Sequence, residues 1–135
     1  MKFWRRLFGK QEAQSGNELS DLPTYWQWIE SRNPLVEFAA IGSIEMVFQT
    51  HPEALGGLEY KRSVELLKGM LNGGREALQA EAITVLAAIK ATDVLPEIVQ
   101  KTKDDDPNVR EKAIRARDEL RHYLETNAKE GKGHR

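Results

Sequence analysis

The chain contains no cysteine, which excludes disulfide bonds, cysteine-ligated zinc, iron–sulfur clusters and thiol chemistry. An excess of charge of one sign is also lacking, because 20 lysines and arginines stand against 21 aspartates and glutamates among 135 residues. Nucleic-acid binders usually carry a basic excess, so this balance argues against that class of protein. No apolar run approaches the roughly 20 residues that a membrane-spanning helix needs. The sequence predicts one compact domain with short tails, in a reducing, cytoplasmic setting that the lack of cysteine fits.

Signals for catalytic chemistry are equally scarce. The three histidines, His51, His122 and His134, share no spacing typical of metal ligands, and no glycine-rich phosphate loop, G-x-S-x-G or H-E-x-x-H motif occurs. The acidic run 104–106 lacks the spacing, the glycine and the distal glutamate of an EF-hand, so it predicts helix capping rather than calcium binding. We therefore expect no enzyme, and no cofactor, metal or small-molecule substrate.

Residues 1–10 differ in composition from the rest of the chain. Four large apolar side chains recur at helical spacing on one face, four cations lie on the other, and there is no acid. The residues that would dock are Lys2, Phe3, Trp4, Arg5, Arg6, Leu7 and Phe8, with Lys10 as the fourth cation. Aromatic side chains favour the headgroup boundary and cations favour anionic lipid, so the segment is predicted to dock on a membrane surface or a partner. The alternatives are that it folds back onto the domain or is a tail without a role.

Composition divides the rest of the chain into three parts. Residues 11–20 are polar and contain glycine and serine, which predicts a flexible linker. Residues 21–125 show helical patterns throughout, without the period-2 alternation or the turn signals of strands and hairpins. Residues 126–135 have almost no apolar side chain, so we expect a disordered tail after a last helix that ends near Glu125.

Turn residues divide 21–125 into six predicted helices. Asn33-Pro34 and Asp106-Pro107 are typical helix starts, because the Asn or Asp side chain caps the first turn and proline needs no N–H partner there. Glycine pairs at 56–57 and 73–74 favour left-handed helix ends. The predicted helices are 21–31, 34–49, one between the two glycine pairs, 75–90, a short one capped by Asp93, and one from Pro107 to near Glu125.

Three of these helices carry an internal repeat. Small or aliphatic residues recur at offsets 0, +4, +7 and +11, which trace one narrow stripe along a helix. The three copies are Val36, Ala40, Ser43 and Val47; Leu78, Ala82, Val85 and Ile89; and Val109, Ala113, Ala116 and Leu120. They lie 42 and 31 residues apart, within the range of helical solenoid repeats.

The positions beside this stripe, at offsets +1, +5, +8 and +12, change in character along the chain. They are mostly apolar in the first two copies and basic in the third. They hold Glu37, Ile41, Ile44 and Phe48; Gln79, Ile83, Leu86 and Lys90; and Arg110, Ile114, Arg117 and Arg121. We expect the first two flanks to be covered by the following repeat, and the third to face water as a cap that ends the array.

The second and third copies resemble a known family. The segments 78–89 (LQAEAITVLAAI), 93–99 (DVLPEIV) and 104–113 (DDDPNVREKA) are similar to HEAT-like repeats of the phycobilisome-lyase type. That family's pattern is a V-R-x-x-A-x-x-A-L helix, a short leucine-rich helix and a D-x-x-V-R turn; the first copy has Glu37 and the second Gln79 in place of the arginine. The resemblance implies an all-α fold, a short right-handed α-solenoid of about three antiparallel helix pairs. It implies a scaffold that binds other macromolecules, and it implies no reaction.

Trp28 is one candidate for binding a partner. Trp26 and Ile29 share a face of the first predicted helix, while Trp28 points elsewhere. An exposed tryptophan is a typical interface anchor. The alternative is that the aromatic residues of this helix serve only to cap the solenoid.

Arg110, Arg117 and Arg121 are the second candidate. Arginines on one helix face can hold a phosphate or an acidic partner. The alternative is a solvated cap in which Arg110 pairs with the loop 104–106.

These patterns predict a non-catalytic protein-interaction adaptor or assembly factor, peripheral at an anionic membrane surface if residues 2–8 dock there. An accessory subunit or chaperone of a phycobilin lyase is the alternative that the resemblance implies. A HEAT-like nucleic-acid-binding protein is disfavoured, because residues 22–100 hold six cations against ten acids and offer no broadly basic face. The predicted partner is therefore another protein, and no nucleic acid.

Overall fold

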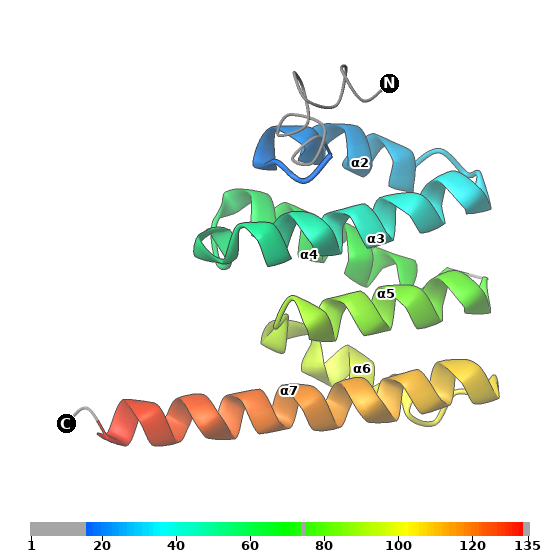
Figure 1. Cartoon of the computed structure of the whole chain (residues 1–135). Coiled ribbons are helices and arrows are strands. Elements are labelled where there is room, and N and C mark those ends of the chain that lie inside the picture. Colours follow the sequence, from blue (N-terminus) through cyan, green and yellow to red (C-terminus); the bar gives the residue numbers. More distant parts are fainter. Residues whose placement is uncertain (1–15, 74, 134–135) are drawn as a thin grey trace, which may run out of the picture.

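The computed structural model describes residues 16–73 and 75–133, with side chains as far as residue 128, and these ranges contain helices and turns but no strand. The all-α fold predicted from the sequence is therefore confirmed. In the labels of Figure 1 the elements are the 3-10 helix η1 (Leu19–Asp21), α2 (Leu22–Ile29), α3 (Pro34–Thr50), the 3-10 helix η2 (Pro52–Ala54), α4 (Leu58–Met70), α5 (Glu76–Ala88), the 3-10 helix η3 (Thr92–Val94), α6 (Leu95–Lys101) and α7 (Pro107–Gly133).

The α-helices of the described chain form three consecutive pairs: α2 with α3, α4 with α5, and α6 with α7. Helices α3, α5 and α7 run in the same direction and form one layer, in which α5 packs against both of the others (Figure 1). Helices α4 and α6 lie behind this layer, and α2 covers α3 at one end of the stack. This arrangement is the predicted α-solenoid.

Side-chain caps begin two helices of the layer at the predicted residues. The Asn33 side chain accepts hydrogen bonds from the backbone N–H groups of Leu35 and Val36, at 3.1 and 3.4 Å, and Pro34 follows it as the first helical residue. The Asp106 carboxylate accepts from the backbone N–H of Val109 at 3.0 Å. Each cap satisfies donors that the first helical turn leaves without a partner.

Left-handed backbone conformations end several helices, but not always at glycine. Of the glycines predicted to end helices, Gly56 has φ +86° as predicted, whereas Gly57 and Gly73 do not adopt a positive φ. Arg32, after α2, and Lys90, after α5, adopt φ of +62° and +61°. The short helix α6 also departs from the prediction, because Asp93 lies within η3 and Val94 is the residue before the first turn of α6.

The repeated stripe forms the core of the stack. In α5 and α7 all of its residues are buried, and in α3 Ala40 and Val47 are buried while Val36 and Ser43 are half-buried. Ala40, Ala82 and Ala113, at the same repeat position, are each fully buried. A methyl group at the closest point of contact allows neighbouring helices to approach one another.

The flanks beside the stripe differ between copies as predicted. Ile41, Ile44 and Phe48 of α3 are buried, and so are Ile83 and Leu86 of α5. Because α3 packs against α5 and α5 against α7, the following repeat covers the first two flanks. The third flank, on α7, faces solvent.

Residues 16–20, predicted as part of a flexible linker, instead contact the first helix pair. The Tyr25 hydroxyl donates a hydrogen bond to the Gly16 carbonyl at 2.6 Å, and the Asp21 carboxylate accepts from the backbone N–H groups of Gly16 and Glu18, both at 3.1 Å. Gly16 has φ +89°, and a Cβ there would lie 2.9 Å from the Tyr25 hydroxyl oxygen. Glycine is therefore needed here for close packing rather than for flexibility.

Helix α7 does not end near Glu125 as predicted but continues to Gly133, so residues 126–133 are helical rather than a disordered tail (Figure 1). The segment 124–130 contains leucine, glutamate, alanine and lysine, which have high helix propensity, and no proline. A helix that is already nucleated extends through such residues without needing an apolar face.

We expect Ala82→Leu and Ala113→Leu each to lower the free energy of unfolding by about 1–3 kcal/mol, because three extra carbon atoms overpack a fully buried helix contact. Ala77→Leu is the matched control, because Ala77 is exposed on α5. Chemical denaturation followed by far-UV circular dichroism measures all three variants. Neutral effects at both buried positions would show that the stripe does not face a neighbouring helix.

Candidate functional site

The exposed flank of the last helix is the first candidate surface. Here the basic flank of α7 means Arg110, Ile114, Arg117 and Arg121. Ile114 is 37% exposed, Arg110 and Arg121 are exposed, and Arg117 is half-buried. One turn further on, Leu124 is 42% exposed on the same side of the helix. The flank thus combines three cations with two accessible apolar side chains.

Two of these arginines have partners within the chain. The Arg110 guanidinium donates to the backbone carbonyl of Asp104 at 2.9 Å, and Arg117 Nε donates to the Asp118 carboxylate at 3.0 Å. Arg110 thus pairs with the loop 104–106, as the solvated-cap alternative predicted, although with a carbonyl rather than a carboxylate. Arg121 makes no hydrogen bond or ion pair within the described residues, so the outer end of the flank carries the freest cation.

Asp104 and Asp106 accept hydrogen bonds from backbone N–H groups, which is the capping role predicted for the loop 104–106. Asp104 accepts from the Asp106 N–H at 2.9 Å, and Asp106 caps α7. The Lys101 ammonium lies 3.6 Å from the Asp104 carboxylate. Within the described residues no group of three or more His, Cys, Asp or Glu is arranged to hold a metal ion.

The aromatic residues of α2 divide between packing and exposure. Tyr25 is buried, and Trp26 is half-buried with its indole N–H donating to the Ser63 hydroxyl on α4 at 2.8 Å. Trp28 is 38% exposed, and its ring meets that of Tyr25 edge to face with the centroids 5.2 Å apart. Trp28 therefore packs against the buried Tyr25 and exposes part of its ring to solvent. It remains a candidate anchor for a partner.

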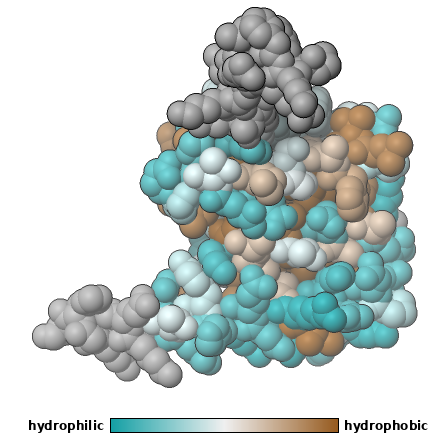
Figure 2. All heavy atoms as spheres, viewed as in Figure 1, coloured by the Kyte–Doolittle hydropathy of each residue, from teal (hydrophilic) through white to brown (hydrophobic). Residues whose placement is uncertain are grey.

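Helix α3 carries an exposed apolar patch near its start and a carboxylate with a raised pKa further along. Hydrophobic side chains gather where α3 begins (Figure 2), and there Leu35 and Phe38 are 82% and 47% exposed. The pKa of Glu45 on α3 is raised, chiefly by burial and then by the charges of Glu81 on α5 and Glu119 on α7. Carboxylates on α5 and α7 thus act on Glu45 of α3, and hydropathy along the sequence gave no sign of that.

A groove of about 600 Å³ lies between α4, the turn from α5 to α6 and the C-terminal half of α7. Tyr60 and Tyr123 line it, together with Lys61, Lys68 and Lys90. The Lys90 ammonium lies 5.3 Å from the centre of the Tyr123 ring. The sequence did not predict this groove, because its walls come from elements that are distant along the chain.

Tyr60 in this groove has a structural role. Its hydroxyl donates to the Ile89 carbonyl, at the end of α5, at 2.7 Å, and its ring meets Phe48 edge to face. Burial raises the pKa of Tyr60 to about 12, with further contributions from the Asp93 charge and from Tyr123. The phenol is therefore neutral at physiological pH, and its hydrogen bond closes the end of α5.

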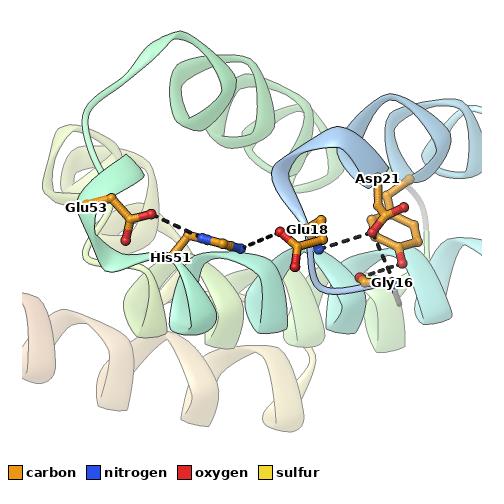
Figure 3. Close-up of polar contacts among 6 residues, drawn as sticks. Gly16, Glu18, Asp21, His51 and Glu53 are labelled. Carbon is orange, nitrogen blue, oxygen red and sulfur yellow. Dashed lines mark hydrogen bonds and ion pairs between the residues drawn. The ribbon is translucent and has the colours of Figure 1, made fainter. Parts of the chain in front are cut away.

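His51 lies between two carboxylates at the end of α3 (Figure 3). Its Nε2 is 3.1 Å from Glu18 and its Nδ1 is 3.1 Å from Glu53. The pKa of Glu53 is lowered, first by a backbone hydrogen bond and then by the bond to His51. The sequence analysis considered His51 only for metal binding, against which its spacing argued, and spacing could not reveal Glu18, which is 33 residues away.

The N-terminal candidates, Lys2, Phe3, Trp4, Arg5, Arg6, Leu7 and Phe8, lie outside the described residues, and so do residues 11–15 of the expected linker. Their docking remains a prediction. None of the helices that the structure describes is long and apolar enough to cross a membrane.

Residues 63–126 match a family model described as HEAT repeats. The match runs from the middle of α4 into α7, and so leaves out α2 and α3, where the first copy departs from the family pattern. Comparison with curated proteins and with solved structures found no match. The fold is an α-solenoid, and its second half is similar to HEAT repeats, which in general serve as scaffolds for protein interaction. The phycobilisome-lyase type remains a prediction.

We expect Tyr60→Phe to lower the free energy of unfolding by about 1–2 kcal/mol near neutral pH, because the Ile89 carbonyl loses its donor. Tyr123→Phe keeps a ring beside Lys90 and is the matched control. Chemical denaturation measures both variants.

Tyr60→Phe should also change how the free energy of unfolding depends on pH in the alkaline range. An unfolded tyrosine loses its proton near pH 10, whereas folded Tyr60 keeps it to about 12, so the folded chain binds more protons between these values. The contribution of Tyr60 to the stability of the wild type should be constant below pH 10 and fall as the pH rises towards 12. Tyr60→Phe should make this fall shallower, and an unchanged slope would contradict the burial of the phenol.

Proposed function

We propose that this protein is a non-catalytic adaptor or assembly factor in which the basic flank of α7 binds an acidic partner protein. The observation that carries this proposal is the exposure of that flank, since the equivalent flanks of α3 and α5 are covered by a neighbouring repeat. The similarity of residues 63–126 to HEAT repeats supports an interaction role in general.

The shape of the flank favours a helical partner. On α3 and α5 the same positions receive a helix that runs alongside, in the layer formed by α3, α5 and α7. A partner helix laid along α7 would continue this layer by the same packing. Ile114 and Leu124 supply apolar contacts for it.

The charge of the flank selects an acidic partner. Where α3 and α5 carry isoleucine, leucine and phenylalanine, α7 carries Arg110, Arg117 and Arg121. Another repeat of the same kind would bury Arg110 and Arg121 without counter-charges, which is costly. Carboxylates on the facing helix would pair with the guanidinium groups, most readily with Arg121.

The second part of the proposal is a peripheral position at an anionic membrane, through residues 2–8, on the cytoplasmic side. Segregated aromatic and cationic side chains support it. Gly16 is hydrogen-bonded to Tyr25 and so belongs to the solenoid. The linker therefore comprises residues 11–15 rather than the ten residues 11–20. Five residues span at most about 17 Å, so the solenoid would sit close to the membrane surface.

The partner surface is tested by charge reversal. Arg110→Glu, Arg117→Glu and Arg121→Glu together should reduce capture of the partner at least about tenfold in affinity purification with the full chain, because like charges would then face each other. The matched control is Arg32→Glu, Arg62→Glu and Lys103→Glu, three exposed cations outside α7. The proposal fails if both triple variants capture the same proteins in the same amounts, provided that thermal melting shows both to be folded.

The membrane segment is tested by flotation with vesicles that contain anionic lipid. Trp4→Glu with Phe8→Glu should abolish binding, because the apolar face is lost. Arg5→Gln with Arg6→Gln should weaken binding and flatten its dependence on salt. Neither pair should change the unfolding of the solenoid by more than about 0.5 kcal/mol if the segment lies outside the core. A wild type that ignores the vesicles would rule out this location.

A further inference from the structure

The two contacts of His51 cannot both be hydrogen bonds from a neutral ring. Nε2 and Nδ1 are each 3.1 Å from a carboxylate oxygen, one on Glu18 and the other on Glu53 (Figure 3). A neutral imidazole carries one N–H and one lone pair, whereas the imidazolium carries two N–H groups. An ionised carboxylate accepts and cannot donate, so only the imidazolium satisfies both.

These contacts join parts of the chain that are distant in sequence. Glu18 belongs to the segment 16–21, which leads from the first residues of the chain into α2, while Glu53 belongs to η2, after α3. The segment is braced internally, because the Asp21 carboxylate holds the N–H groups of Gly16 and Glu18. Its bond to His51 therefore ties a pre-formed turn to the end of α3.

We propose that His51 is a proton-dependent clasp, which in its protonated form fixes Glu18 of segment 16–21 against the end of α3. When the proton is lost, one carboxylate faces a lone pair and moves away. Glu53 lies two residues from His51 and remains near the ring, so Glu18 is the partner that is released.

The direction of the pH dependence follows from the groups that face the ring. Within the described residues these are Glu18, from the segment before η1, and Glu53, from η2; α2 and α3 place no ionised group in contact with it. The clasp is closed while the ring holds two protons between two ionised carboxylates, and it opens when a rise in pH removes one of these protons.

A spin label on the segment tests the clasp in the full chain. The chain has no cysteine, so a nitroxide on Ser20→Cys, an exposed site in η1, is the sole label. Electron paramagnetic resonance at pH 5.5 and pH 8 should show the ratio of mobile to immobile label rising about threefold at the higher pH, the size typical of an exposed ion pair. A ratio that does not change with pH would overturn the proposal.

Three further variants, each carrying the label, separate the clasp from other effects of pH. His51→Gln and Glu18→Gln should both give the mobile ratio of the pH 8 wild type at either pH. His122→Gln, on the exposed side of α7, should keep the wild-type response. A pH response that persists in His51→Gln, or disappears in His122→Gln, would assign it to another group. No vesicle or partner is present, so the outcome is independent of the function proposed above.

Discussion

The structure depends on one repeated contact, the close approach of helices at a small side chain. Ala40, Ala82 and Ala113 occupy the same repeat position in α3, α5 and α7, and none of them is accessible to solvent. A methyl group at that point lets the helix axes approach to the lower part of the usual 8–10 Å range. The larger side chains on either side then fill the space between the helices. Because the same position recurs, the three helices share one direction and one layer.

This stacking also decides which surfaces are left for other molecules. Each flank that receives the next helix is lost to solvent, as Ile44 on α3 and Leu86 on α5 show. The flank of α7 has the same position in its repeat, but its cations prevent it from receiving another helix of that kind. The surface that we propose for partner binding is therefore at the stacking position of the repeat but carries cations in place of apolar side chains. At the other end, the Trp26 indole is hydrogen-bonded to Ser63 on α4, whereas Trp28 is the exposed tryptophan of α2.

Most of the fold could be predicted because its signals are local. Asn33 and Asp106 mark helix starts by their own side chains, and the alanine stripe follows from helical periodicity alone. The predicted end of α7 was wrong because a polar composition was taken as a sign of disorder. Helix propensity and the presence of an already nucleated helix decide where a helix ends.

The site was less predictable, because its contacts join residues that are far apart in the sequence. Glu18 meets His51 across 33 residues, and Tyr60 meets Ile89 across 29. No periodicity links such pairs, and each depends on how one helix pair is placed on the next. The exposure of the basic flank could be predicted, since it needs only the repeat offsets. The apolar patch of Leu35 and Phe38 was not, because α3 is apolar around much of its circumference and the sequence does not say which face is covered.

The unequal lengths of the stacked helices give the molecule a lever. Helix α5 has 13 residues and spans about 20 Å, whereas α7 has 27 and spans about 40 Å. Packing holds α7 from Val109 to Leu120, and Lys90 reaches it as far as Tyr123. Beyond that point the helix projects from the stack (Figure 1). A force applied at the C-terminal end of α7 would therefore exert a large torque on the part of the helix that is packed around Ala113. The core of the last repeat would be the first to be strained by such a force.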